Sequence, residues 1–187
     1  MKIITAMVEG GKVTGIYLKP DNTLNRKRLP FFVPEEPAEV AARVGVAVTI
    51  EKVGKTIRQE FAERYYEKAA LAVEVTDMTA LKRAREEGEP WTMAVGMDGS
   101  LTLSEFREIK EMTTAEVETD GEMWGEYEVA RLLERVPEVM TKVSSVMTMK
   151  TGDIVVVVDG ERERRLRIGE TIVVSGKEGK EIELMIK

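Results

Sequence analysis

Alternation of apolar and polar residues predicts strands over much of the chain, in runs bounded by glycine, aspartate and proline. The first two strands are joined by Glu9-Gly10-Gly11-Lys12 and should form a hairpin. The strands predicted at residues 114–119 and 122–126 meet at Asp120-Gly121, which is a strong two-residue turn signal. The strands predicted in this way cover residues 2–8, 13–19, 43–52, 69–76, 114–119 and 122–126.

Apolar residues at helical spacing predict three helical regions, over residues 57–67, 79–87 and about 127–148. Gly88 should end the second, because glycine readily adopts the left-handed conformation found after a helix. Pro137 should break or kink the third, because proline lacks the backbone N–H that an interior helical turn needs.

Two hairpins are predicted in the last forty residues. Residues 154–158 should pair with 163–168 around Asp159-Gly160, and residues 170–175 with 180–186 around Gly176 to Gly179. Many short strands with few helices predict an α+β fold. With no linker-like segment, residues 1–187 are expected to form one domain.

Composition removes several classes of function. The net charge of −6 argues against a nucleic-acid partner. The absence of cysteine excludes disulfides and thiolate chemistry, and the absence of histidine removes the commonest general base and metal ligand. No apolar run approaches the ~20 residues that cross a bilayer, so no membrane partner and a cytoplasmic location are expected.

Two local features carry candidate chemistry. Lys52-Val53-Gly54-Lys55-Thr56 is similar to the end of a phosphate-binding loop, but Thr49 stands where the first glycine is needed, so a simple turn is the better interpretation. Glu74 interrupts an apolar strand, and an acid in that position must be paired, protonated or bound to a metal. A structural partner is favoured over a catalytic role for Glu74.

Several segments together resemble the fumarylacetoacetate hydrolase family, whose members include hydrolases, isomerases and decarboxylases of small dioxo-acids. Their order and spacing carry the resemblance, which covers about residues 15–187. It implies a layered, mixed β-sandwich or roll with a few helices. The matching segments are Tyr17-Leu18-Lys19-Pro20, Leu29-Pro30, residues 46–66, Pro90-Trp91, Met97-Asp98-Gly99-Ser100, Met149-Lys150-Thr151-Gly152-Asp153 and Ile168-Gly169-Glu170.

The resemblance also implies a divalent cation held by carboxylates, and the residues at those positions differ here. The two glutamates of a Glu-x-Glu pair correspond to Arg43 and Gly45, whereas the third acidic ligand corresponds to Glu74. Two substrate-contacting positions are Met78 and Leu81, and a catalytic lysine position is Val95. A threonine-rich loop becomes Val157-Val158-Asp159-Gly160, which is expected to be a tight hairpin.

These differences suggest a catalytically degenerate, metal-free member of the family, more a pseudoenzyme than an enzyme, with no cofactor. Three roles stay open. The chain could pair with itself or with an active paralogue; it could hold a small carboxylate ligand; or it could be an enzyme on a small dioxo-acid with a relocated site.

Two structural expectations follow from the same resemblance. The chain is expected to form a homodimer, as members of the family usually do. Arg43 is expected to reach towards Glu74, directly or through one water, as an internal substitute for the charge of the metal. The alternative is that Arg43 points to solvent while backbone amides or a nearby lysine satisfy Glu74.

Overall fold

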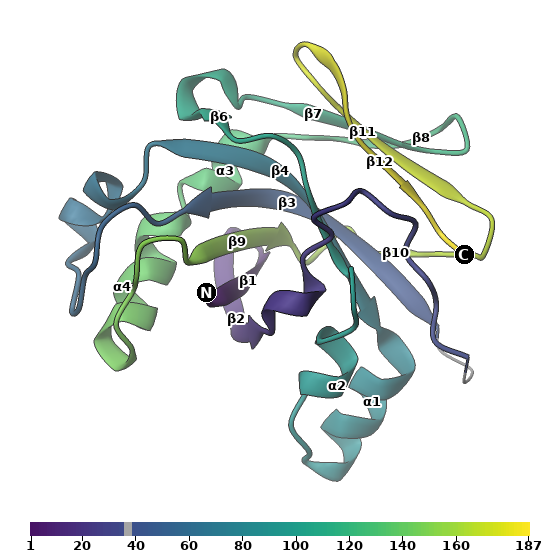
Figure 1. Cartoon of the computed structure of the whole chain (residues 1–187), viewed down its shortest axis with the longest axis horizontal. Helices are drawn as coiled ribbons and strands as arrows, with labels where there is room; N and C mark the ends of the chain where they lie inside the picture. The colour runs from purple at the N-terminus through teal and green to yellow at the C-terminus, as the bar shows by residue number, and fades with distance from the viewer. Residues whose placement is uncertain (36–38) are drawn as a thin grey trace.

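The computed structural model describes residues 1–35 and 39–187, and its strands lie in two sheets (Figure 1). The large sheet has the order β2-β1-β9-β3-β4-β5, with β10 paired to β3 and β6 paired to β4. Its strands are β1 (Ile3–Glu9), β2 (Lys12–Lys19), β3 (Val40–Thr49), β4 (Lys68–Asp77), β5 (Leu101–Leu103), β6 (Arg107–Glu108), β9 (Ile154–Asp159) and β10 (Arg164–Arg165).

The small sheet has the order β12-β11-β7-β8 and is built from two antiparallel hairpins. Its strands are β7 (Ala115–Thr119), β8 (Glu122–Tyr127), β11 (Thr171–Gly176) and β12 (Gly179–Met185). The left-handed backbone at Asp120 and Gly121 forms the first of these turns, as the sequence predicts.

Two of the α-helices pack against the large sheet, and the other two lie together at its lower margin in the view of Figure 1. The α-helices are α1 (Met78–Glu87), α2 (Thr92–Val95), α3 (Val129–Leu133) and α4 (Val136–Val146), and the 3-10 helices are η1 (Asp21–Thr23), η2 (Gln59–Tyr65) and η3 (Ile109–Glu111). Gly88 ends α1 at a φ of 71°, and Pro137 sits in the first turn of α4, so both helix boundaries agree with the sequence. Among the described residues, no helix is both long and apolar enough to cross a membrane.

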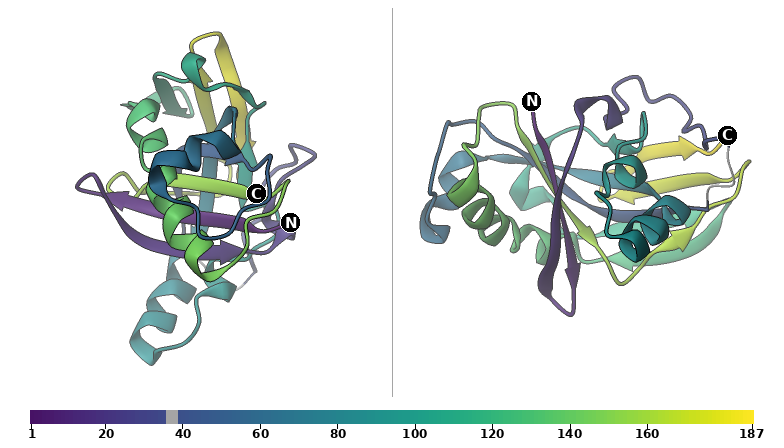
Figure 2. Two further views of the ribbon diagram at one scale, coloured as in Figure 1. Left: turned by 90° about the vertical axis from the view of Figure 1, so that its left-hand side faces the viewer. Right: turned by 90° about the horizontal axis from the view of Figure 1, so that it is seen from below.

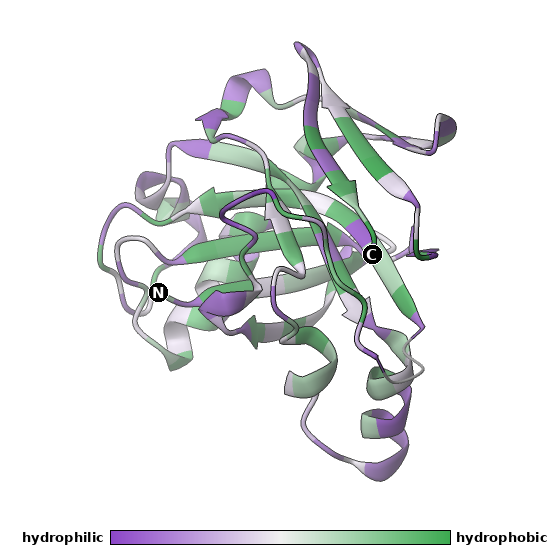
Figure 3. Cartoon of the chain, turned by 45° about the vertical axis from the view of Figure 1, so that its right-hand side comes forward, coloured by the Kyte–Doolittle hydropathy of each residue, from purple (hydrophilic) through white to green (hydrophobic). Residues whose placement is uncertain are grey.

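The main core fills the space between the two sheets and beneath α3 and α4. Strand residues from both sheets meet Val139, Met140 and Val143, which share one face of α4. Each fully buried aliphatic side chain of this size contributes about 1.5–3 kcal/mol to stability. Figure 3 shows the same pattern as apolar strands with polar residues at the hairpin tips.

Two predictions of local structure are wrong. Residues 59–65 form a 3-10 helix instead of an α-helix. The guanidinium groups of Arg58 and Arg64 each lie 4.5 Å from the ring centroid of Phe61. A repeat of three residues per turn stacks side chains three positions apart, which allows this arrangement.

The hairpin predicted around Asp159-Gly160 does not form. Strand β9 pairs in parallel with β1 and antiparallel with β3, whereas β10 pairs with β3. The backbone N–H of Gly160 donates to the carbonyl of Val8. A local turn signal cannot specify a partner strand about 150 residues away, and β1 competes successfully for β9.

Candidate active site

The large sheet curls until its first strand faces its fifth. In the sheet order β4 is the fourth strand from β2, so in a flat sheet the two strands would lie ~19 Å apart. The hydroxyl of Tyr17 on β2 nevertheless lies 2.8 Å and 2.7 Å from the two carboxylate oxygens of Glu74 on β4. Figure 2 agrees, because in its right-hand view the hairpin β1–β2 runs steeply across β3 and β4. The concave face of this curl holds the candidate site.

Lys19 completes a buried triad with Tyr17 and Glu74. Tyr17 and Lys19 are two residues apart, so a strand presents both on the same face. The Lys19 Nζ lies 3.0 Å from Glu74 Oε1, and the side chains of both residues are 0% exposed. A buried carboxylate is costly unless it is paired and hydrogen-bonded. Here Glu74 meets both conditions.

Burial changes the proton affinities of the triad. It raises the pKa of Tyr17 well above the usual value, with the Glu74 charge and hydrogen bond acting in the same direction. Burial lowers the pKa of Lys19, and the positive charge of Arg43 adds to this, whereas Glu74 opposes it. Tyr17 is therefore held as a neutral phenol, and the Lys19 ammonium gives up its proton more readily than an exposed lysine does.

Arg43 borders the triad from β3. It is the direct register partner of Glu74, but its Nη2 forms an ion pair with Glu163, and its Nη1 lies 3.4 Å from Thr76 Oγ1. Arg43 is therefore buried and does not point into solvent. Its Nε has no hydrogen-bond partner among the described residues, and the same is true of Thr5 Oγ1. Thr5 lies on the concave face, because its neighbours Ile3 and Met7 pack there.

Gly45 lies on the same face, two residues from Arg43. A Cβ atom added to Gly45 would approach the carbonyl oxygen of Val157 to 2.1 Å. The backbones of β3 and β9 are therefore too close for any side chain at this position. A glutamate ligand could not be accommodated at residue 45 without separating these strands.

Three further residues at functional positions of the family, Met78, Leu81 and Val95, form an apolar cluster beside the triad. Leu81 on α1 and Val95 on α2 are buried in one cluster with Ala94, and Met78 packs against it. Tyr17 contacts this cluster. These side chains therefore fix the orientation of the phenol instead of contributing polar chemistry.

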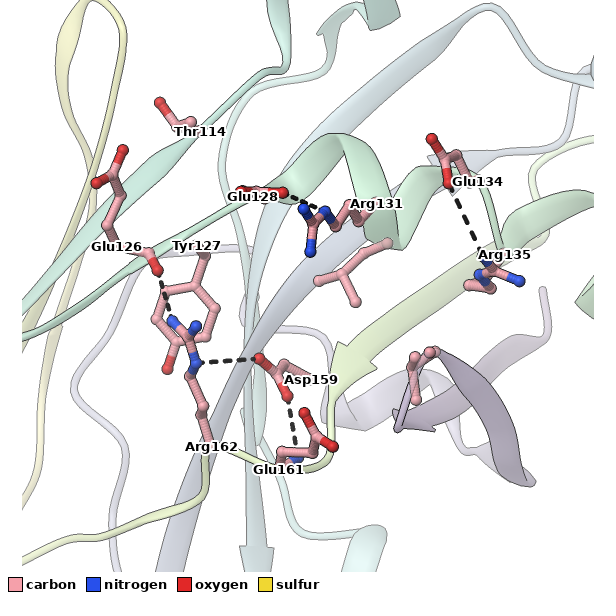
Figure 4. A pocket seen from close by; sticks show the side chains of 13 residues that line it. Thr114, Glu126, Tyr127, Glu128, Arg131, Glu134, Arg135, Asp159, Glu161 and Arg162 are labelled. Carbon is pink, nitrogen blue, oxygen red and sulfur yellow. Dashed lines mark hydrogen bonds and ion pairs between the residues drawn. The ribbon is translucent and has the colours of Figure 1, made fainter.

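The remaining two positions lie away from the concave face. Val157 is buried in the main core, because Val156 and Val158 take the opposite face. Asp159 lines a separate cleft of about 670 Å³ at the end of β9 (Figure 4). In this cleft Arg162 pairs with Asp159 at 3.6 Å, and Arg131 and Arg135 pair with Glu128 and Glu134. All three arginines that line the cleft are thus already paired with acidic side chains.

The residues of the concave face do not fit a hard divalent cation. Such an ion needs several oxygen ligands, yet both Glu74 oxygens already accept hydrogen bonds, and Arg43 places a cation beside them. Within residues 1–35 and 39–187, no three acidic side chains gather closely enough to hold a metal ion.

Comparison with known proteins places the chain in a family. Residues 7–183 match the family model described as fumarylacetoacetate (FAA) hydrolase, C-terminal. The chain belongs to the fumarylacetoacetate hydrolase family. The family identification and the α+β fold class drawn from the sequence are therefore both confirmed.

Similar proteins from this family are named enzymes. The chain is 26% identical over 145 residues to a mitochondrial oxaloacetate decarboxylase of Dictyostelium discoideum, covering 74% of this chain and 66% of that protein. It is 25% identical over 169 residues to the oxaloacetate tautomerase YcgM of Escherichia coli (strain K12), covering 86% and 76%. The matched region thus spans about two thirds to three quarters of these relatives.

A solved structure shows the same fold. The fumarylpyruvate hydrolase from Pseudomonas aeruginosa in complex with Mn²⁺ and pyruvate superposes with a TM-score of 0.86 at 17% sequence identity. The superposition covers 100% of this chain and 89% of that structure. At this identity the likeness establishes the fold alone.

These relatives overturn the interpretation of the chain as a catalytically degenerate pseudoenzyme that is more likely not an enzyme. That interpretation is wrong, because similar proteins are named as a decarboxylase and a tautomerase. The pseudoenzyme interpretation assumed that a site without metal ligands cannot catalyse any reaction. Tyr17, Lys19 and Glu74, however, still form a cluster of ionisable side chains. The homodimer, the small-carboxylate ligand, the absence of metal and the one-domain organisation stay predictions.

Sequence reasoning identified Glu74 and Arg43 but missed Tyr17, Lys19 and Thr5 as site residues. A usable signal was present. Glu74 in an apolar strand demands a cation, and Lys19 is a lone lysine at the end of a strand whose alternate positions include Tyr17. What could not be read from the sequence was the curl that brings β2 to β4.

Proposed function

We propose that this chain is an enzyme that acts on a small oxo-carboxylic acid, by moving a proton at the carbon next to the ketone. The observation that carries the proposal is the buried Tyr17–Glu74–Lys19 triad. The names of the relatives, which act on oxaloacetate and fumarylpyruvate, support the substrate class. Tautomerisation is the simplest reaction of this kind.

Each residue has a role that follows from its chemistry. Glu74 is the carboxylate base that takes the proton from carbon. Tyr17 stays protonated, so its hydroxyl can donate to the ketone oxygen as negative charge develops on it. Preorganised donors in a water-poor site stabilise such charge far better than water does. The cation on Lys19 balances the charge that remains on the triad.

Arg43 is suited to bind the carboxylate of the substrate. A guanidinium recognises a carboxylate through paired N–H donors, and the Arg43 Nε is a buried donor without a partner among the described residues. Glu163, which pairs with Arg43, has a side chain that is 29% exposed, whereas the side chains of Lys19 and Glu74 are fully buried. Substrate binding therefore requires Glu163 to release Arg43.

The test is turnover of oxaloacetate, measured as the rate at which its enol absorbance decays towards the keto–enol equilibrium. Wild-type protein should accelerate this decay, and Tyr17→Phe should lower kcat by about 100-fold, the usual effect of removing one such donor. Tyr65→Phe is the matched control, because Tyr65 packs on the main core. Equal activity in wild type and Tyr17→Phe would contradict the proposed site.

A further inference from the structure

The amine of Lys19 is placed where covalent chemistry with a ketone is feasible. Its Nζ is enclosed and lies 3.0 Å from Glu74 Oε1. The Tyr17 hydroxyl contacts the same carboxylate oxygen at 2.8 Å. A buried carboxylate that can take a proton from the amine is therefore in contact with both that amine and a phenol, and the phenol can pass a proton to a leaving hydroxyl.

Among the described residues of the concave face, no set of side chains fits a metal ion that could draw electrons from the ketone. Gly45 is closed off by the backbone of β9, and Arg43 occupies the neighbouring strand position. The oxygens of Glu74 are engaged as ion-pair and hydrogen-bond acceptors. These residues do not fit a metal ion as an electrophile, whereas the Lys19 amine can provide a stronger electron sink than the hydrogen bond that Tyr17 donates to a ketone oxygen.

We propose that Lys19 forms a covalent imine with the ketone of a small 2-oxo-carboxylic acid. This proposal rests on the proposed function, because it assigns the same site and substrate class a chemical intermediate. The protonated imine draws electrons from the neighbouring carbon, which permits loss of a proton there.

The atoms and charges of this step balance. Lys19 passes one proton to Glu74, and the neutral Nζ attacks the carbonyl carbon. A C–N bond forms as the C–O π bond breaks, and one proton moves from the nitrogen to the oxygen, which becomes a hydroxyl. Protonation of that hydroxyl, with Tyr17 relaying the proton from Glu74, expels water. Ammonium and ketone thus give a protonated imine and one water, with no oxidant or reductant. Hydrolysis by the reverse route releases the product.

Other features of the chain fit this role. Arg43 lies on the neighbouring strand and can hold the carboxylate next to the ketone. The cluster of Leu81, Ala94 and Val95 packs against Tyr17 and keeps that side of the site apolar. An apolar surround favours nucleophilic lysines, because it disfavours the charged ammonium.

The test is reductive trapping on the full chain. Wild-type protein is incubated with pyruvate and sodium borohydride, which reduces an imine to a stable amine, and is then examined by intact mass and peptide mapping. The expected result is one adduct per chain, located on Lys19. An adduct confined to other lysines, or no adduct, would overturn the proposal.

Two variants sharpen the result. Lys19→Arg keeps a cation for Glu74 but removes the nucleophilic amine, so the adduct should disappear. Lys55→Arg is the matched control, because the Lys55 Nζ donates to the carbonyl of Val146 far from the triad, and it should leave the adduct unchanged. If Lys19→Arg fails to fold, the peptide map of the wild-type protein still shows whether the adduct is on Lys19 or on another lysine.

The failure of this inference and the failure of the proposed function are distinguishable. Turnover of oxaloacetate without a trapped adduct would overturn the imine and leave the proposed function standing. An adduct on Lys19 without turnover of any oxo-acid would support the imine and contradict the proposed function.

Discussion

Arg43 and Glu74 face each other as direct register partners on β3 and β4, yet each takes a different partner for its charge. Arg43 pairs with Glu163, and Glu74 pairs with Lys19. Of the two forms of the Arg43–Glu74 contact expected from the sequence, the direct ion pair does not form. A contact through one water stays a prediction. The cation that stands in for a metal charge beside Glu74 is Lys19, from a strand on the opposite side of the curl.

The Arg43–Glu163 pair leads to a prediction about substrate affinity. Glu163→Gln should lower KM for oxaloacetate, because a neutral amide competes less well than a carboxylate for the guanidinium. Arg43→Met should raise KM by about 10- to 100-fold, which corresponds to the loss of about 1.5–3 kcal/mol from charged hydrogen bonds. Glu161→Gln, on the same connection, serves as the control. Unchanged KM in both site variants would remove Arg43 from the substrate site.

The Lys19–Glu74 pair should show strong coupling in stability. Lys19→Met leaves a buried, unpaired carboxylate and should cost about 3–5 kcal/mol in the free energy of unfolding. Combining it with Glu74→Gln should recover much of that loss, as measured by urea denaturation in a double-mutant cycle. The exposed pair Lys180–Glu183 offers a comparison, and it should show little coupling. If the losses in free energy of unfolding for the two single variants simply add in the double variant, the Lys19–Glu74 ion pair does not contribute to stability.

Gly45 should be intolerant of even one methyl group. Gly45→Ala would force a Cβ into the carbonyl of Val157 at 2.1 Å, and we expect a loss of about 1–3 kcal/mol or more in the free energy of unfolding. Gly15→Ala is the control, because its Cβ would meet only the end of the Met7 side chain at 3.5 Å. Thermal denaturation of both variants would show whether close approach of β3 and β9 is the constraint.

Asp153 should make stability fall in acid. Burial opposes its ionisation, but hydrogen bonds from the side chain and backbone of Lys2 and the backbone of Lys150 outweigh this and lower its pKa. The stabilisation is complete well above the unfolded pKa of about 3.9 and is lost as pH falls through the lower folded pKa. Asp153→Asn should therefore be less stable at neutral pH and show a shallower loss below about pH 4. An unchanged acid profile would exclude Asp153 as the cause.

Divalent cations should not stabilise the folded chain. A ligand that binds only the native state raises the free energy of unfolding. The Tm in millimolar magnesium, manganese or calcium chloride should therefore equal the Tm in potassium chloride of the same ionic strength. A rise of several degrees with one of these metals would contradict the donor-set argument for the concave face. Glu74→Gln would then show whether the metal binds at that carboxylate.

The sequence predicts the local elements well and their partners less well. Alternation predicts β1, β2, β4, β7 and β8, and the glycine and proline signals at Gly88 and Pro137 mark helix boundaries correctly. These features depend on neighbouring residues alone. The pairing of β9 with β1, by contrast, depends on two strands distant in sequence. Because the curl follows from that pairing, the contact of Tyr17 and Lys19 with Glu74 could not be predicted.

The parallel pairing of β1 with β9 has a consequence for how the chain folds during synthesis. Ile3 is the register partner of Ile154, so β1 must wait for a strand that is made about 150 residues later. At ~5–20 residues per second, the interval between them is on the order of ten seconds. Through that time β1 presents an unpaired edge to other nascent chains, a hazard for aggregation. The hairpin partner β2 protects only one edge of β1, so refolding yield should depend steeply on protein concentration.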